Sequence, residues 1–193
     1  AHAHEHQVVE RLGARLLHGH ARQAGARADN EVTPAEGGAR VGELGVVAAA
    51  SDLEPGRDTI TSWLPLHHDM GLVQLLAGMT NDVPVDLMPP YSFLRDPLSW
   101  LRHISTRRGT ITAAPPFGYR TAADRQRTRD EALDLSHVRR AYVGAEPIPA
   151  DVLHDFTSTF ATSGLPEDAL VPCYGMAETV LATSLALNPR NAS

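Results

Sequence analysis

The sequence predicts an α/β fold in which helices flank a largely parallel β-sheet. Short runs of β-branched and aromatic residues alternate with stretches whose large apolar residues recur every three or four positions. Strands that alternate with helices indicate units in which a helix connects two parallel strands. We expect strands within the segments DTITSWL (58–64), VPVDLM (83–88), GTITAA (109–114), VRRAYVG (138–144) and ALVPCY (169–174).

Two helices between these strands have recognisable N-terminal signals. Asp96 is a predicted helix cap, and Pro97 suits the first turn that follows it. The apolar face of this helix consists of Leu98, Leu101 and Ile104. Pro149 precedes the second helix, whose apolar face consists of Val152, Leu153, Phe156 and Phe160.

Residues 1–45 are expected to form an N-terminal helix and a linker, and residues 46–193 the α/β domain. Apolar residues at helical spacing predict a helix over 5–24; they are Val8, Val9, Leu12, Leu16 and Leu17. Residues 25–45 are rich in glycine, alanine and charge, which is typical of a linker.

Charge and composition exclude several classes of function. The net charge of −6, from 23 acidic and 17 basic residues, argues against a nucleic-acid-binding surface. All the basic residues are arginines, so a lysine nucleophile, a Schiff base and a phosphate-loop lysine are excluded. Cys173 is the single cysteine, which rules out an internal disulfide and favours the cytoplasm. No apolar run has the length of a membrane span.

Unusual residues follow three of the predicted strands. His67, His68 and Asp69 follow the first strand, residues 144–147 follow the fourth, and residues 175–179 follow the fifth. Ligands of open α/β sheets bind beyond the carboxyl ends of the strands. We therefore expect these three loops to meet around one ligand.

Each loop also has a structural interpretation. In the first loop, Asp69 could cap a helix that starts at Met70, and one of the two histidines could be buried in the core. Alternatively, the imidazole of one histidine could bind a ligand or relay a proton near neutral pH. Neighbouring histidines lack the spacing of a helical zinc pair. Residues 144–147 alone would be a turn from strand to helix. Glu178 could bind a hard cation, and the hydroxyl of Thr179 could donate to a phosphate.

Four segments, taken in order, resemble the adenylate-forming superfamily: SWLPLHHDMGL, PYSFLRDPLSWL, YVGAEPI and PCYGMAET. Within it they are most similar to the fatty acyl-AMP ligases, which are related to the acyl-CoA synthetases. The resemblance runs from about Ala48 to Leu185. It implies part of an N-terminal domain that binds ATP, Mg²⁺ and a carboxylate. Such enzymes form an acyl-adenylate and pass the acyl group to the thiol of an acyl carrier protein or coenzyme A.

The resemblance also implies a role for each residue of the three loops. His68 and Asp69 would lie at the reacting acyl carbonyl, Glu178 would hold Mg²⁺, and Thr179 would contact the α-phosphate. The residues that would contact the acyl substrate are His67, Met70, Gly71 and Met176. Those that would bind the adenine are Gly144, Ala145, Glu146, Pro147, Tyr174 and Gly175.

The chain departs from the family pattern in its phosphate loop. Residues 32–45, VTPAEGGARVGELG, contain Glu36 and Glu43 and no lysine, so they are poorly suited to a triphosphate. The sequence also ends at Ser193, before the family's ribose-binding aspartate and small C-terminal domain. We expect the chain to lack ATP turnover by itself, whether it is part of a larger ligase or a natural miniature. The oligomeric state stays open.

Two other functions stay open beside carboxylate activation. One is an ATP-independent enzyme that acts on an acyl or carrier-bound intermediate, with His68 as general acid or base. The other is a non-catalytic subunit that binds an acyl carrier protein through exposed arginines.

Overall fold

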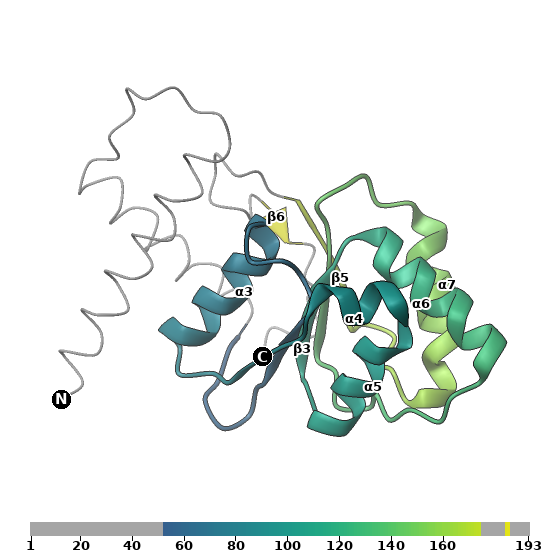
Figure 1. The fold of residues 1–193 in the computed structure, drawn as a ribbon, viewed down its shortest axis with the longest axis horizontal. Helices are drawn as coiled ribbons and strands as arrows, with labels where there is room; N and C mark the ends of the chain where they lie inside the picture. The colour runs from purple at the N-terminus through teal and green to yellow at the C-terminus, as the bar shows by residue number, and fades with distance from the viewer. Residues whose placement is uncertain (1–51, 175–183, 186–193) are drawn as a thin grey trace.

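A computed structural model describes residues 52–174 and 184–185 of the 193-residue chain (Figure 1). The predicted N-terminal helix and linker lie outside the described residues. So do four predicted site residues, which are Gly175, Met176, Glu178 and Thr179.

The described strands form one sheet in the order β2-β1-β3-β4-β5-β6. The strands are β1 (Ile60–Ser62), β2 (Val85–Leu87), β3 (Ile111–Ala114), β4 (Arg140–Val143), β5 (Leu170–Tyr174) and β6 (Ser184–Leu185). Strands β1 to β5 are all parallel, and β6 pairs with β5 in the antiparallel direction. All five predicted strands and the parallel α/β architecture are therefore confirmed.

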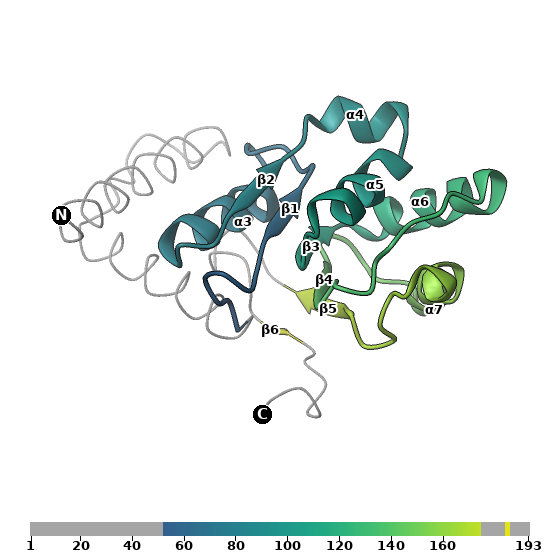
Figure 2. The same ribbon diagram turned by 90° about the horizontal axis from the view of Figure 1, so that it is seen from below.

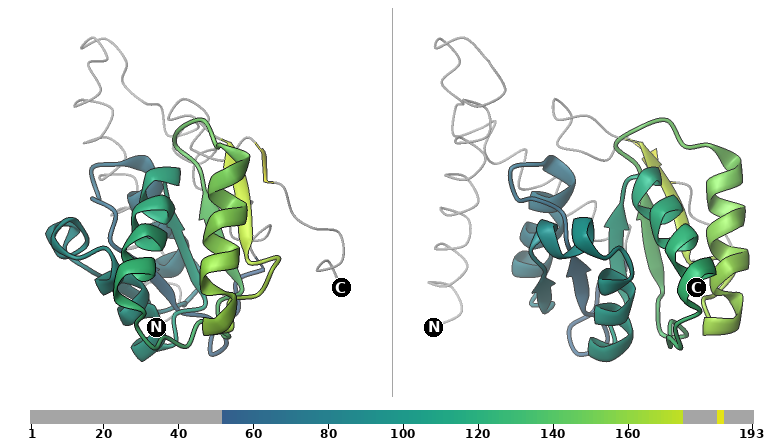
Figure 3. Two further views of the ribbon diagram at one scale, coloured as in Figure 1. Left: turned by 90° about the vertical axis from the view of Figure 1, so that its right-hand side faces the viewer. Right: turned by 45° about the vertical axis from the view of Figure 1, so that its right-hand side comes forward.

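Helices connect these strands and cover both faces of the sheet. They are α3 (Asp69–Thr80), α4 (Pro90–Arg95), α5 (Leu98–Arg107), α6 (Pro116–Arg129) and α7 (Ala150–Phe160), followed by the 3-10 turn η1 (Ala161–Ser163). Figure 2 shows α3 on one side of the row of strands and α5 and α6 on the other. The left view of Figure 3 shows α6 and α7 side by side. This alternation of helices places every βα loop at one edge of the sheet.

The core between the helices and the sheet is rich in aromatic rings. Trp63 stacks on Phe93 with ring centroids 3.8 Å apart, and Trp100 packs edge-on against Tyr119 at 5.3 Å. The indole Nε1 of Trp100 donates a 3.0 Å hydrogen bond to Thr112 Oγ1 on β3. The predicted apolar faces are confirmed, because the residues that they present to this core are buried; these are Leu98, Leu101, Ile104, Val152, Phe156 and Phe160, with Leu153 partly buried beside them.

Asp96 lies at the start of α5 in agreement with the predicted cap. Pro97, directly after it, already has helical backbone angles, and the carbonyl of Asp96 accepts the N–H of Ser99 at 2.9 Å. The carboxylate of Asp96 has a hydrogen bond from the backbone N–H of Leu98, and it also accepts hydrogen bonds from Arg102 (3.3 Å) and Arg129 (3.1 Å) through Oδ2. This side chain therefore links the start of α5 to the end of α6.

A buried ionic network joins the amino ends of the central strands. Asp58, whose side chain is fully buried, accepts two hydrogen bonds from Arg139, at 2.9 and 2.8 Å, and one from Thr110 at 2.8 Å. Arg57 and the backbone N–H of Glu54 also donate to it. Burial works to raise the pKa of Asp58, but the hydrogen bonds from Arg139, Glu54 and Thr110 outweigh it and lower the pKa from 3.8 to about 2.

Candidate functional site

Residues from three segments meet at the carboxyl edge of the sheet, which is the upper edge in Figure 1. Strands β1, β4 and β5 are parallel, so the chain leaves each of them at this edge. A Cβ atom placed on Gly144 would lie 2.7 Å from Cys173 Sγ and 3.2 Å from Met70 Cε. The segments after β1 and β4 and the end of β5 are therefore in contact at Gly144, and only a residue without a side chain fits there.

The two histidines after β1 are both exposed to solvent, and their ring centroids lie 5.5 Å apart. Neither ring has a hydrogen bond to another side chain in the described part of the chain. The alternative prediction, that one of the two histidines is buried in the core, was therefore wrong. His68 instead contributes its backbone as the N-cap of α3, since its carbonyl accepts the N–H groups of Gly71 (3.0 Å) and Leu72 (2.9 Å).

Helix α3 begins one residue earlier than the proposed cap required. Asp69 is the first residue of α3, so the prediction that Asp69 is its N-cap was wrong. A carboxylate in the first turn still interacts favourably with the helix dipole. Met70 is buried against Gly144, and a Cβ on Gly71 would collide with the carbonyl oxygen of Pro65. Gly71 thus allows α3 to start close to the end of β1.

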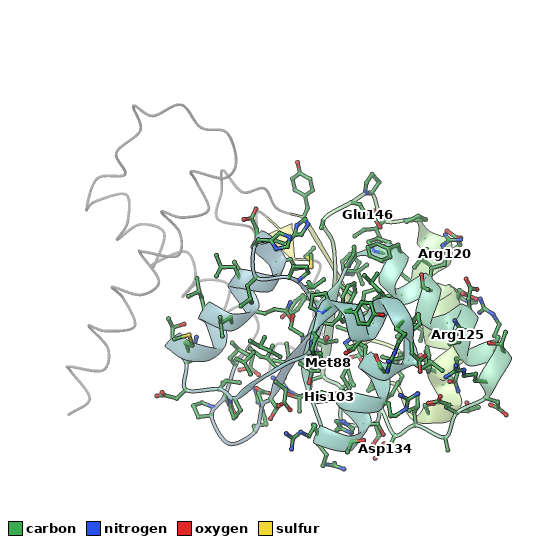
Figure 4. All side chains as sticks on the ribbon, in the orientation of Figure 1. Met88, His103, Arg120, Arg125, Asp134 and Glu146 are labelled. Atoms are coloured by element: carbon green, nitrogen blue, oxygen red, sulfur yellow. The ribbon has the colours of Figure 1, made fainter. Side chains whose placement is uncertain are left out.

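The loop after β4 has an unusual backbone. Ala145 adopts a left-handed conformation with φ of +69°, which costs a residue with a side chain about 1–3 kcal/mol. Glu146 is exposed and accepts a 3.1 Å hydrogen bond from the backbone N–H of Phe117 at the start of α6 (Figure 4). Pro147 is exposed, and Pro149 directly precedes α7 as predicted. The exposed part of this loop is therefore held in a defined shape.

Strand β5 ends at the same edge with one exposed ring and one protected thiol. The side chain of Tyr174 is 59% exposed. Cys173 donates a hydrogen bond from Sγ to the carbonyl of Val143 at 3.3 Å, and burial raises the pKa of its thiol to about 11. A thiol that stays protonated at neutral pH is a poor nucleophile, so Tyr174 is the side chain of β5 that is available to a ligand.

Sequence reasoning missed the segment after β3. Because β3 lies between β1 and β4 in the sheet, the Pro115-Pro116-Phe117 turn that follows it occupies the middle of the carboxyl edge. The ring of Phe117 is 47% exposed and packs edge-on against Trp63, with centroids 6.1 Å apart. The signal was available, since GTITAA was a predicted strand and two prolines mark the start of a helix.

The described residues contain no group of three or more histidine, cysteine, aspartate or glutamate side chains that could hold a metal ion. Glu178, the predicted Mg²⁺ ligand, lies outside them. In the same part of the chain, no helix combines the length and the apolar character that crossing a membrane requires.

Residues 39–193 match the family model of the AMP-binding enzymes. The chain belongs to this family. It is 39% identical over 137 residues to the 4-hydroxyphenylalkanoate adenylyltransferase of Mycobacterium tuberculosis, a match that covers 70% of this chain and 22% of that protein. It is 39% identical over 126 residues to a medium-chain fatty acid–acyl carrier protein ligase of Moorena producens, covering 64% of this chain and 21% of the relative.

A solved structure shares the fold. The fatty acyl-adenylate ligase of Legionella pneumophila, in complex with acyl adenylate and pyrophosphate, superposes with a TM-score of 0.73 and 35% identity. The match covers 77% of this chain and 26% of that chain. These findings confirm the predicted resemblance to adenylate-forming enzymes and to acyl-AMP ligases among them. The chain spans only about a fifth to a quarter of the length of these relatives.

Proposed function

We propose that this chain supplies the acyl- and adenylate-binding part of a carboxylate-activating enzyme. The observation that supports this function best is the contact of three segments at Gly144, at the edge of a parallel sheet where ligands of such folds bind. Membership of the AMP-binding family makes an acyl-adenylate the ligand to expect there. The substrate would be a carboxylic acid, and an acyl carrier protein or coenzyme A would accept the acyl group.

The residues of this edge fit the AMP part of such a ligand. Gly144 is buried against Cys173 and Met70, whereas Ala145, Glu146 and Pro147 are exposed, so a flat ring can lie against the backbone that follows Gly144. The exposed ring of Tyr174 can stack on an adenine. The adenine would therefore lie along residues 144–147, against Tyr174, with Gly175 completing the contact. ATP, when bound, would supply the AMP group that is transferred to the carboxylate, with pyrophosphate as the leaving group.

The acyl side of the ligand would face the start of α3. His68 would donate a hydrogen bond from its exposed ring to the acyl carbonyl oxygen, where negative charge develops during transfer. The N-terminus of α3 favours the same charge, while Asp69 in the first turn of the helix opposes it. His67, Met70, Gly71 and Met176 would contact the acyl group.

No cluster among the described residues fits Mg²⁺, so we derive no step through the metal. Glu178 would be its ligand, and Thr179 would contact the α-phosphate. We further propose that this chain alone does not turn over ATP, because it contains no lysine and residues 32–45 are acidic. The purified chain should show no ATP–pyrophosphate exchange. Robust exchange would refute this part of the proposal.

Calorimetry with three ligands tests the site directly. A non-hydrolysable acyl-sulfamoyl adenosine should bind, whereas ATP and the free fatty acid should bind far more weakly. Tyr174→Ala should weaken binding about tenfold through the loss of ring stacking, and Tyr174→Phe should retain it. A wild-type chain that does not bind the adenylate mimic, or a Tyr174→Ala variant that binds it unchanged, would contradict the assignment.

One observation favours a second candidate function. The rings of His67 and His68 are exposed at the carboxyl edge and make no side-chain hydrogen bond to the rest of the described chain. Such an imidazole is free to act as a general base on a carrier-bound acyl group without ATP. Turnover of an acyl thioester would then be abolished in His68→Ala and retained in His67→Ala. Binding of the carrier without any turnover would instead indicate a non-catalytic subunit.

A further inference from the structure

Helix α6 begins in a way that leaves its first amide without a local partner. Pro115 occupies the N-cap position and Pro116 the first helical position. Neither proline has a backbone N–H, and neither has a side-chain oxygen that could cap the helix. The first backbone donor of α6 is therefore the N–H of Phe117, which needs an acceptor from elsewhere.

That acceptor comes from the loop after β4. The carboxylate oxygen Oε1 of Glu146 accepts the Phe117 N–H at 3.1 Å across 29 residues of sequence. Figure 4 shows Glu146 at the upper edge of the molecule, above Arg120 of α6. A carboxylate at a helix N-terminus is favoured both by the free amide and by the helix dipole. Glu146 therefore acts as the missing cap of α6.

This hydrogen bond also fixes the loop that contains Glu146. On one side of the loop, Gly144 packs against Cys173 and Met70. Ala145 follows with its left-handed backbone, which a residue with a side chain adopts only where its surroundings impose it. Glu146 provides the restraint on the other side. The backbone of residues 144–147 is thus held at two points, and the second point is a single side chain.

The Phe117 amide, to which Glu146 is hydrogen-bonded, belongs to a residue that is fixed by ring contacts. The ring of Phe117 packs edge-on against Trp63 and Phe93, at centroid distances of 6.1 and 6.4 Å. Trp63 and Phe93 are only 3% and 2% exposed, so the start of α6 is attached to the buried core. The hydrogen bond between Glu146 and the Phe117 amide therefore fixes the 144–147 loop relative to the core.

We propose that Glu146 is a positioning residue for nucleotide binding: its carboxylate holds the 144–147 loop in the shape that receives the adenine. The inference rests on the proposed function, because that function assigns the loop to the adenine. Glu146 acts through the Phe117 amide and the loop backbone, and it needs no contact of its own with the ligand.

The test compares three variants of the full chain. Glu146→Ala removes the acceptor, and Glu146→Gln keeps an oxygen that can accept the same N–H. Asp151→Asn is the matched control, because Asp151 is an exposed acid five residues after Glu146 that pairs with Arg120 of α6 at 3.1 Å. Hydrogen exchange of the free protein reports on the loop, and calorimetry with acyl-sulfamoyl adenosine reports on binding.

Glu146→Ala should accelerate exchange at the Phe117 amide and in residues 144–149, and it should weaken binding of the mimic about two- to tenfold. Glu146→Gln should restore both properties to near wild type, and Asp151→Asn should leave both unchanged. Unchanged exchange and binding in Glu146→Ala would overturn the inference, as would an equal effect of Asp151→Asn. If the wild-type chain fails to bind the mimic, the proposed function fails, and the exchange comparison still decides whether Glu146 holds the loop.

Discussion

Replacing Asp58 with asparagine should destabilise the protein by about 2–3 kcal/mol at neutral pH. The substitution preserves the shape of the side chain and removes its charge from between Arg139 and Arg57. The asparagine amide would also direct N–H groups at guanidinium donors, which cannot accept them. The effect is therefore a loss of charge-assisted hydrogen bonds in a buried site.

The magnitude follows from the pKa of Asp58. The difference between its ordinary value of 3.8 and about 2 in the folded protein, at about 1.4 kcal/mol for each pKa unit, corresponds to roughly 2.5 kcal/mol. Because the folded-state pKa is the lower one, this stabilisation is complete above about pH 5. It decreases as the pH falls from about 5 to about 1, as first the unfolded and then the folded protein binds the proton.

Urea unfolding of wild type and Asp58→Asn at pH 7, 5, 3 and 2.5 measures this dependence. The stability difference should be constant between pH 7 and 5 and should shrink at the two lower values. Asp52→Asn is the matched control, since Asp52 contacts the same Arg57 at 3.1 Å but is 63% exposed, and it should cost less than about 1 kcal/mol. A difference that is the same at every pH, or equal losses in the two variants, would refute the reasoning.

Three further predictions concern the loops and the core. Gly144→Ala should cost about 1–3 kcal/mol and weaken binding of the adenylate mimic, because its methyl group would overlap Cys173; an unchanged melting temperature would contradict this contact. At pH 8 the Cys173 thiol, with a pKa of about 11, should react with Ellman's reagent about a hundredfold more slowly in the folded protein than in urea, and equal rates would disprove its protection. Trp100→Phe should cost about 1–3 kcal/mol in urea unfolding through the loss of its hydrogen bond to Thr112, and a loss below about 0.5 kcal/mol would show that the bond contributes little.

Periodicity in the sequence was enough to predict the strands and the buried helix faces. Those features depend on spacing along a single segment, as in the helix that buries Val152, Phe156 and Phe160. The contact of Asp96 with Arg129 could not be predicted in this way, because Arg129 belongs to another helix. Local propensity contains no information about such a partner.

The order of the strands could not be predicted in the same way. It determines that the turn at Phe117 lies between the loops after β1 and β4, and so it creates the contact with Glu146. The sequence identified Glu146 through its resemblance to a family, whereas the partner of its carboxylate appeared only in three dimensions. Long-range contacts of this kind decide the shape of the site although no short motif encodes them.

The four residues of β4, Arg140–Val143, separate the buried ionic network from the 144–147 loop. The ionic network ends at Arg139, directly before the strand, and the 144–147 loop starts at Gly144, directly after it. At about 3.3 Å for each residue, the two regions are more than 13 Å apart. Sites this far apart usually contribute independently to the free energy of unfolding, so a stability loss from a change at the carboxyl edge, such as Gly144→Ala, can be offset at the amino edge without altering the loop.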